Sequence, residues 1–220
     1  MSEIKAIETF YKGYHFRSRL EARWAVFFDT VGIEWKYEDQ GFEREMHDYD
    51  REGEVKATRV ERYLPDFYLP HRWISGGIYV EVKGDTNALK KDWHRHSEMH
   101  DFGGILPHFN DSYRKQYGLL LLSEIPEPST SKIYLHPILQ HHKGLCKSYA
   151  FFEGNNVSVV GAEPLSRMLG VEPVHGLDSS GDDWGIDTRQ VHTSRYYPKV
   201  YEAYAAARAA RFEHGQQGTK

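Results

Sequence analysis

The sequence has little of three things: cysteine, long apolar runs and excess positive charge. Cys146 is the single cysteine of 220 residues, which excludes an internal disulfide framework and suits a reducing compartment. The longest apolar runs, such as residues 119–122, are far shorter than the roughly 20 residues that a membrane-spanning helix needs. Residues 1–6 lack the basic and apolar regions of a secretory signal. We therefore expect a cytoplasmic protein that has no membrane partner.

The charge balance is mildly acidic, with 28 Lys and Arg against 32 Asp and Glu. This counts against a protein that coats nucleic acid nonspecifically, because such proteins use a broad basic surface. It is compatible with an enzyme that holds a metal through carboxylates and guides a phosphate backbone along a local basic strip. The length suits one domain, or one domain with a modest appendage.

A first helix is predicted over residues 16–31, and Gly32 predicts its end. Its apolar positions recur at helical spacing and are Leu20, Trp24, Phe27 and Val31. Glu21 falls inside this apolar arc, where a carboxylate needs a partner. Two interpretations are open: Glu21 belongs to a functional site, or it is a structural acid paired with Arg17.

Strands are predicted after this helix. The first covers residues 33–37 and is followed by an irregular or hairpin insertion over residues 38–61. Two further strands, at residues 62–69 and 78–83, are separated by a segment that contains Pro and paired Gly. This order indicates an antiparallel hairpin.

The predicted hairpin brings two carboxylates together. If it closes symmetrically, Leu69 pairs with Ile78 and Asp66 lies directly opposite Glu81. Mg²⁺ prefers oxygen ligands and typically uses one or two protein carboxylates together with water. The sequence therefore predicts a metal site at Asp66 and Glu81.

Two neighbours of Glu81 extend this predicted site. Lys83 shares the face of Glu81, because side chains alternate along a strand, and its ammonium is suited to orient water or to offset charge on a reacting phosphate. The backbone carbonyl of Val82 is a candidate further ligand. The alternative is that Glu81 and Lys83 are an ordinary charge pair on a surface strand.

A second helix is predicted over residues 87–102, followed by a strand at residues 118–123 that is apolar throughout and therefore expected to be covered on both faces. The helix carries Lys90, Lys91 and Arg95 on its surface. These three side chains are either an ordinary solvated face or a strip that guides a phosphate backbone.

The remaining chain predicts strands at residues 133–136, 148–152 and 157–160, which either extend the sheet or form a small second unit. A loop is expected over residues 176–195. A helix with an apolar face of small residues is expected over residues 198–212.

Four residues in this part have side chains of the types that bind zinc: His136, His141, His142 and Cys146. Their spacing fits no standard zinc signature. We therefore leave them out of the expected site.

Two short motifs resemble the PD-(D/E)xK nuclease superfamily. They are YLPDF at residues 63–67 and VEVKG at residues 80–84. The helix that carries Glu21 also resembles the first helix of small phage and transposon-end members, and the likeness covers about residues 10–125. It implies an α/β, restriction-endonuclease-like core in the order helix, three strands, helix, strand, with a mixed sheet flanked by helices.

The resemblance also implies roles for these residues. It implies that the catalytic residues are Glu21, Asp66, Glu81 and Lys83, and that the ligands of Mg²⁺ or Mn²⁺ are Asp66, Glu81, Val82 and Glu21. The implied activity is endonucleolytic hydrolysis of DNA in phage replication, repair or defence, with RNA an open alternative substrate. A homodimer is also open, because duplex cleavage requires two cuts.

We accordingly divide the chain into a nuclease core at residues 1–125 and an extension at residues 126–220 that ends in a helix. The alternative function is a catalytically silent module on the same fold that binds nucleic acid or inhibits a protein. All the expected catalytic residue types are present, which favours the enzyme over the silent module.

Overall fold

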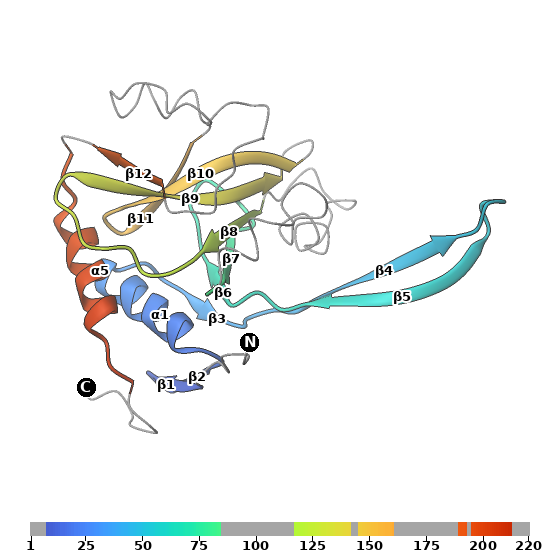
Figure 1. Cartoon of the computed structure of the whole chain (residues 1–220), viewed down its shortest axis with the longest axis horizontal. Coiled ribbons are helices and arrows are strands. Elements are labelled where there is room, and N and C mark those ends of the chain that lie inside the picture. The colour runs from blue at the N-terminus through green and yellow to red at the C-terminus, as the bar shows by residue number, and fades with distance from the viewer. Residues whose placement is uncertain (1–7, 85–116, 142–144, 161–188, 193–194, 213–220) are drawn as a thin grey trace, which may run out of the picture.

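The computed structural model describes residues 8–84, 117–141, 145–160, 189–192 and 195–212. Within these residues the protein is mixed α/β. Two helices lie against one central sheet, and a two-stranded arm extends away from both (Figure 1). The helix predicted over residues 87–102 lies outside the described residues.

The central sheet joins strands from both halves of the chain. Along the sheet the order is β11 (Asn156–Val160), β10 (Leu145–Glu153), β9 (Lys132–His141), β8 (Gly118–Leu122), β7 (Ile78–Val82), β6 (Phe67–Leu69) and β3 (Lys36–Tyr37). β7 and β8 are parallel, and the other neighbours are antiparallel. The strands that follow residue 126 therefore continue the sheet that contains the predicted hairpin.

A further short strand, β12 (Arg189–His192), pairs with the first half of β9. The prediction of a loop throughout residues 176–195 is wrong for these four residues. Their pairing partner lies more than fifty positions away in the chain, so the local Gly, Ser and Asp content gave no sign of it.

The first helix, α1 (Arg19–Val31), has a cap at each end. The hydroxyl of Ser18 accepts a hydrogen bond from the backbone N–H of Glu21 at 3.2 Å. Gly32 closes the helix in the left-handed conformation with φ of 83°, which glycine adopts without steric cost. The stop predicted at Gly32 is confirmed, whereas the start predicted at residue 16 is wrong because Ser18 is the N-cap.

The residues before α1 form a small hairpin of their own. β1 (Thr9–Tyr11) pairs with β2 (Tyr14–Phe16), and Lys12 and Gly13 turn the chain with positive φ. Phe16 is fully buried. The sequence prediction placed Phe16 in the helix, although this residue belongs to a strand.

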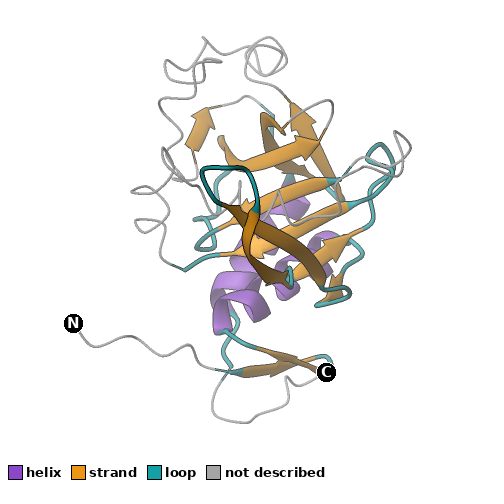
Figure 2. Ribbon diagram, turned by 90° about the vertical axis from the view of Figure 1, so that its right-hand side faces the viewer, coloured by secondary structure: helices purple, strands orange, loops and turns teal. Residues whose placement is uncertain are grey.

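The two helices lie together on one side of the sheet (Figures 1 and 2). The ring of Phe27 in α1 contacts Phe152 of β10 and Tyr204 of α5 (Pro198–Ala209), both with centroids 4.6 Å apart. Phe28 contacts Phe67 of β6 at 5.4 Å. These aromatic contacts fix the helix over the strands that hold the predicted hairpin.

The terminal helix and the apolar strand begin where the sequence predicts, but they end at Ala209 and Leu122 instead of at residues 212 and 123. α5 begins at Pro198 and buries one face, formed by Val200, Ala203, Tyr204 and Ala207. Every residue of β8 is buried, as expected of a strand covered on both faces. Within the described residues, neither helix has the length and apolar character that crossing a bilayer requires.

The predicted insertion is a long hairpin, the arm, made of β4 (Phe42–Tyr49) and β5 (Val55–Tyr63). The single strand predicted over residues 62–69 is therefore wrong, because its first two residues end β5 and β6 begins only at Phe67. Pro65 lies between them and has no N–H to donate to a ladder. The strand predicted over residues 33–37 is reduced to Lys36–Tyr37.

Candidate functional site

The β6–β7 hairpin has the register that its sequence predicts. Leu69 pairs with Ile78, and Phe67 pairs with Val80. One further step along the same register places Asp66 opposite Glu81. The two carboxylates therefore leave neighbouring strands at the same end of the hairpin, as the sequence predicts.

Asp66 is almost completely buried, with 3% of its surface exposed. One carboxylate oxygen, Oδ2, accepts a hydrogen bond from the backbone N–H of Val82 at 2.7 Å. The other, Oδ1, accepts from Nη2 of Arg17 at 2.6 Å. Asp66 thus links the end of β7 to the residues that precede α1.

Glu81 is also buried, with 7% of its surface exposed. Its Oε2 accepts a hydrogen bond from the hydroxyl of Tyr63 at 2.9 Å, and its Oε1 lies 2.8 Å from Nζ of Lys83. The ion pair shows that Glu81 and Lys83 lie on the same side of the strand, as alternation predicts. The Lys83 side chain keeps 30% of its surface exposed, so its ammonium borders the solvent.

Glu21 is held by hydrogen-bond donors on both carboxylate oxygens. Ser18 donates its hydroxyl to Oε1 at 2.6 Å, and the Tyr37 hydroxyl donates to Oε2 at 2.6 Å. The backbone N–H of Arg17 also donates to Oε2, at 3.2 Å. These contacts explain how a carboxylate is tolerated in the apolar arc of α1.

The guanidinium of Arg17 pairs with two acids other than Glu21. Besides Asp66 it contacts Glu38, with Nε and Oε1 2.7 Å apart. Glu38 has a positive φ of 47°, and its backbone N–H donates to the carbonyl of Asp66 at 3.0 Å. The interpretation of Glu21 as a side-chain partner of Arg17 is therefore wrong in its detail, because the contact runs through the Arg17 backbone.

The charges of Glu81 and Glu21 both act on Asp66. The pKa of Asp66 is raised well above its ordinary value, first by burial and then by the negative charges of Glu81 and Glu21. The hydrogen bond from Val82 and the charge of Arg17 oppose this rise. Ionising Asp66 is thus unfavourable unless more positive charge is nearby.

Two tyrosines act as fixed donors to these acids. Burial, and next the charge of Glu81, raise the pKa of Tyr63 well above its ordinary value. Burial and the hydrogen bond to Glu21 likewise raise the pKa of Tyr37. Both hydroxyls therefore keep their protons at neutral pH and donate hydrogen bonds to the carboxylates.

The pair Asp66 and Glu81 fits a hard divalent cation. Among the residues that the structure describes, no three His, Cys, Asp or Glu side chains form a group that could hold a metal, so Glu21 is not placed as a third ligand. Mg²⁺ needs only one or two protein carboxylates and keeps several waters. A dication would also favour the ionised form of Asp66, although Arg17 must first release the Oδ1 atom of that acid.

Among the other candidates from the sequence, the structure describes the side chain of His136. His136 is buried, packs against the rings of Trp24 and Phe152, and shares a hydrogen bond with Tyr204. Burial lowers its pKa to about 3, so it is a neutral core residue. Zinc at this cluster stays a hypothesis, because His142 and the side chains of His141 and Cys146 lie outside what the structure describes. Residues Lys90, Lys91 and Arg95 also lie outside it.

Three contributors were absent from the sequence prediction: Ser18, Tyr37 and Tyr63. Arg17 was considered only as a partner of Glu21, and its contact with Asp66 was missed. A signal existed for one of them, since Ser18 and Glu21 have the Ser-x-x-Glu spacing of a capping box. Tyr63 has no such signal, because its role depends on where the arm joins the sheet.

Comparisons with models of protein families, with curated proteins and with solved structures found no match. The residues of the site therefore carry the functional argument.

Proposed function

We propose that the protein is a cytoplasmic, metal-dependent endonuclease that hydrolyses phosphodiester bonds in DNA on a restriction-endonuclease-like core. One observation carries the proposal. Asp66 and Glu81 are buried acids that leave neighbouring strands at one end of a hairpin, and Lys83 contacts Glu81 from the solvent side. A buried acid whose pKa is raised, beside a second buried acid and an adjoining cation, is typical of a catalytic site.

Asp66 and Glu81 are the proposed ligands for Mg²⁺ or Mn²⁺, with the carbonyl of Val82 as a further ligand. When bound, the ion supplies Lewis acidity toward the phosphate and lowers the pKa of a water. In hydrolysis the water oxygen bonds to phosphorus, the bond to the leaving oxygen breaks, and that oxygen takes up a proton. Lys83 is placed to stabilise the negative charge that builds on the phosphate oxygens.

The remaining contacts hold this pair in place. Tyr63 orients Glu81 through its hydroxyl, and the N–H of Val82 orients Asp66. Glu21 orders the residues that begin α1, including Arg17, so we propose that it acts first as a positioning residue. Direct ligation by Glu21 remains part of the proposal, and it requires release of the donors Ser18 and Tyr37.

The alternative is a catalytically silent module that binds nucleic acid or inhibits a protein. The contact between Arg17 and Asp66 favours it, because a guanidinium already satisfies one oxygen of that acid. Such a module has no need of a divalent ion. Absence of Mn²⁺ binding would select this alternative.

The test is a cleavage assay with Mg²⁺ or Mn²⁺ on a panel of linear, branched and chemically modified DNA and RNA. We expect cleavage of at least one DNA that stops on chelation with EDTA and is restored by added metal. The matched control is Glu81→Gln, which keeps the shape and removes the charge. Equal cleavage by this variant, or no cleavage of any substrate, contradicts the proposal.

A further inference from the structure

The arm stands apart from the rest of the protein. Within the described residues β4 and β5 pair only with each other, and the ribbon projects from the body (Figure 1). Phe42 and Tyr63 are buried at its base, and the described side chains beyond them are exposed or half-buried. A two-stranded ribbon is marginally stable alone, and its unpaired edges are templates for another strand.

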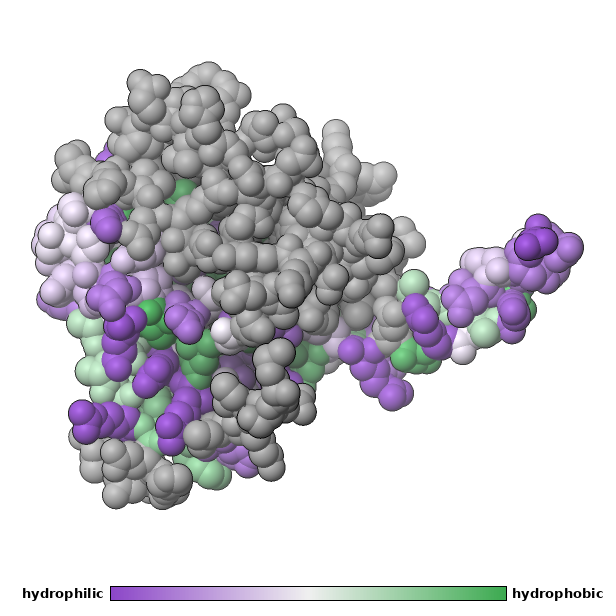
Figure 3. Space-filling model, in the orientation of Figure 1, coloured by the Kyte–Doolittle hydropathy of each residue, from purple (hydrophilic) through white to green (hydrophobic). Residues whose placement is uncertain are grey.

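One face of the arm gathers its exposed apolar side chains. Cross-strand partners share a face, and the register pairs Tyr49 with Val55 and Glu45 with Val60. The three apolar members of these pairs are among the most exposed large hydrophobic side chains. Figure 3 shows some green, hydrophobic atoms on an arm whose surface is otherwise mainly purple and hydrophilic.

The charge of the arm selects the kind of partner. Residues 42–63 contain five Lys and Arg against seven Asp and Glu. Nucleic-acid contacts depend on neutralising phosphates with an excess of basic side chains, and the arm lacks such an excess. The occupant that fits is therefore a protein strand.

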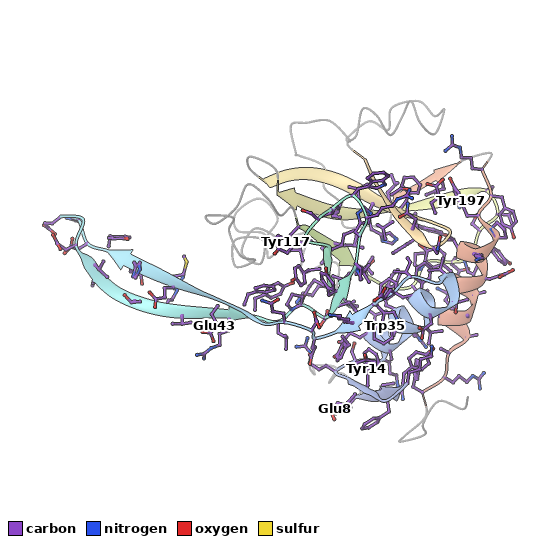
Figure 4. All side chains as sticks on the ribbon, turned by 180° about the vertical axis from the view of Figure 1, so that it is seen from behind. Glu8, Tyr14, Trp35, Glu43, Tyr117 and Tyr197 are labelled. Atoms are coloured by element: carbon purple, nitrogen blue, oxygen red, sulfur yellow. The ribbon has the colours of Figure 1, made fainter. Side chains whose placement is uncertain are left out.

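We propose that the occupant is a second copy of this chain, with β4 pairing antiparallel to the β4 of that copy about Met46. In this register Glu45 lies opposite His47 of the second copy, and Glu43 lies opposite its Tyr49. Because the pairing is two-fold, each contact occurs twice. Figure 4 shows Glu43 on the arm, outside the body, where a second strand can reach it.

The charges also select this register over its neighbours. A shift by one residue in one direction brings Glu43 opposite Asp48. A shift in the other direction brings Glu45 opposite Asp48. Like charges directly opposite each other destabilise a strand pair, and a shift also turns the apolar face the other way. Pairing about Met46 avoids both outcomes.

Such pairing would fix the separation of two candidate sites. Tyr63 joins the base of β5 to Glu81, so the arm and the site are mechanically continuous. Phe42 of one chain and Phe42 of the other would lie eight residues apart along the ladder, which is roughly 27 Å. This pairing does not depend on the proposed nuclease activity, because measuring the association of two copies is enough to test it.

The first test is sedimentation velocity on the full chain at tens of micromolar. We expect a dimer. Glu45→Lys removes the contact between Glu45 and His47 of the second copy, so it should weaken association several-fold. Adding His47→Glu to Glu45→Lys again places an acid opposite a base and should restore it. A monomeric parent, or a dimer that is indifferent to both changes, overturns the inference, as does a monomer that uses the arm to bind DNA.

The second test reads the register. In a Cys146→Ser background, Met46→Cys places two thiols across the two-fold axis, where opposed Cα atoms lie about 4.5 to 5.5 Å apart and oxidation can join them. The matched control is Asp48→Cys, whose two copies would lie four residues apart, roughly 13 Å. We expect a cross-linked dimer from the first variant only. Equal cross-linking of both variants, or none from either, overturns the register.

Discussion

The arm and the hairpin of the candidate site contain the same kind of contact in opposite surroundings. On the arm, Arg62 meets Glu43 at 2.6 Å, with side chains 74% and 62% exposed. At the site, Arg17 meets Asp66 at the same distance, but the Asp66 side chain is only 4% exposed. Water screens the first pair, so it contributes little to stability. Burial makes the second acid difficult to ionise and therefore chemically useful.

The two regions also differ in what surrounds their strands. The site hairpin is covered by α1, whose Phe28 contacts Phe67 of β6, and it continues into β8 through parallel pairing. The arm has no such cover among the described residues. The difference teaches that packing against α1 and β8 supports the acids of the β6–β7 hairpin, whereas the described residues of the arm are supported mainly by their own ladder.

The largest expected difference is in cleavage. Glu81→Gln should lower the rate by about a thousandfold, because a metal ligand and its charge are lost from a buried site. The same substitution on the arm, Glu43→Gln, should leave the rate unchanged. Single-turnover kinetics on the best substrate measure both. A comparable loss from the two variants would show that the arm takes part in the chemistry.

Removing a buried ring and removing an exposed ring of the arm should also differ in their effect on the free energy of unfolding. Phe28→Ala removes a fully buried ring and should lower the free energy of unfolding by about 3 to 5 kcal/mol. Tyr49→Ala on the arm should change it by less than about 0.5 kcal/mol, as is usual for exposed positions. Urea unfolding followed by tryptophan fluorescence compares them. A large loss from Tyr49→Ala at low protein concentration would mean that the arm packs on its own body.

A smaller effect is expected from removing the guanidinium of Arg17, which contacts Asp66. Arg17→Met keeps much of the side-chain length but removes the donor to Oδ1, so Mn²⁺ no longer competes with it. We expect apparent Mn²⁺ affinity to rise about fivefold, which corresponds to roughly 1 kcal/mol. The matched arm variant Arg62→Met should have no effect. Weaker Mn²⁺ binding by Arg17→Met would instead show that Arg17 orders the site.

The smallest effect concerns pH. The pKa of Asp66 is raised in the folded state by burial and by the nearby acids, so the folded protein binds this proton more tightly than the unfolded chain. The stability from this group is present below the ordinary aspartate pKa and is lost as pH rises through the raised value. Asp66→Asn should therefore flatten the fall in metal-free stability from weakly acidic to neutral pH. An unchanged slope would contradict the raised pKa.

The sequence was most informative where one local pattern determined the answer. Alternation and the symmetric turn correctly predicted that Leu69 pairs with Ile78, which places Asp66 opposite Glu81. The apolar run at β8 and the small-residue face of α5 were predicted for the same reason, because burial leaves a short periodic signature.

The sequence was least informative where distant segments meet. Tyr63 reaches Glu81 only because the arm ends beside β7, and Arg17 reaches Asp66 across 49 positions of the chain. β12 became a strand only through its pairing with β9. Such contacts depend on the assembled sheet, so local propensity carries no trace of them.

The most direct measurement of the central claim is calorimetric titration of Mn²⁺ into the metal-free protein and into Glu81→Gln. If Asp66 and Glu81 form a metal site, the parent should bind a single ion, and Glu81→Gln should bind at least tenfold more weakly while keeping a parent-like circular dichroism spectrum. Binding of equal strength by the two proteins, or no binding by the parent, would contradict the account.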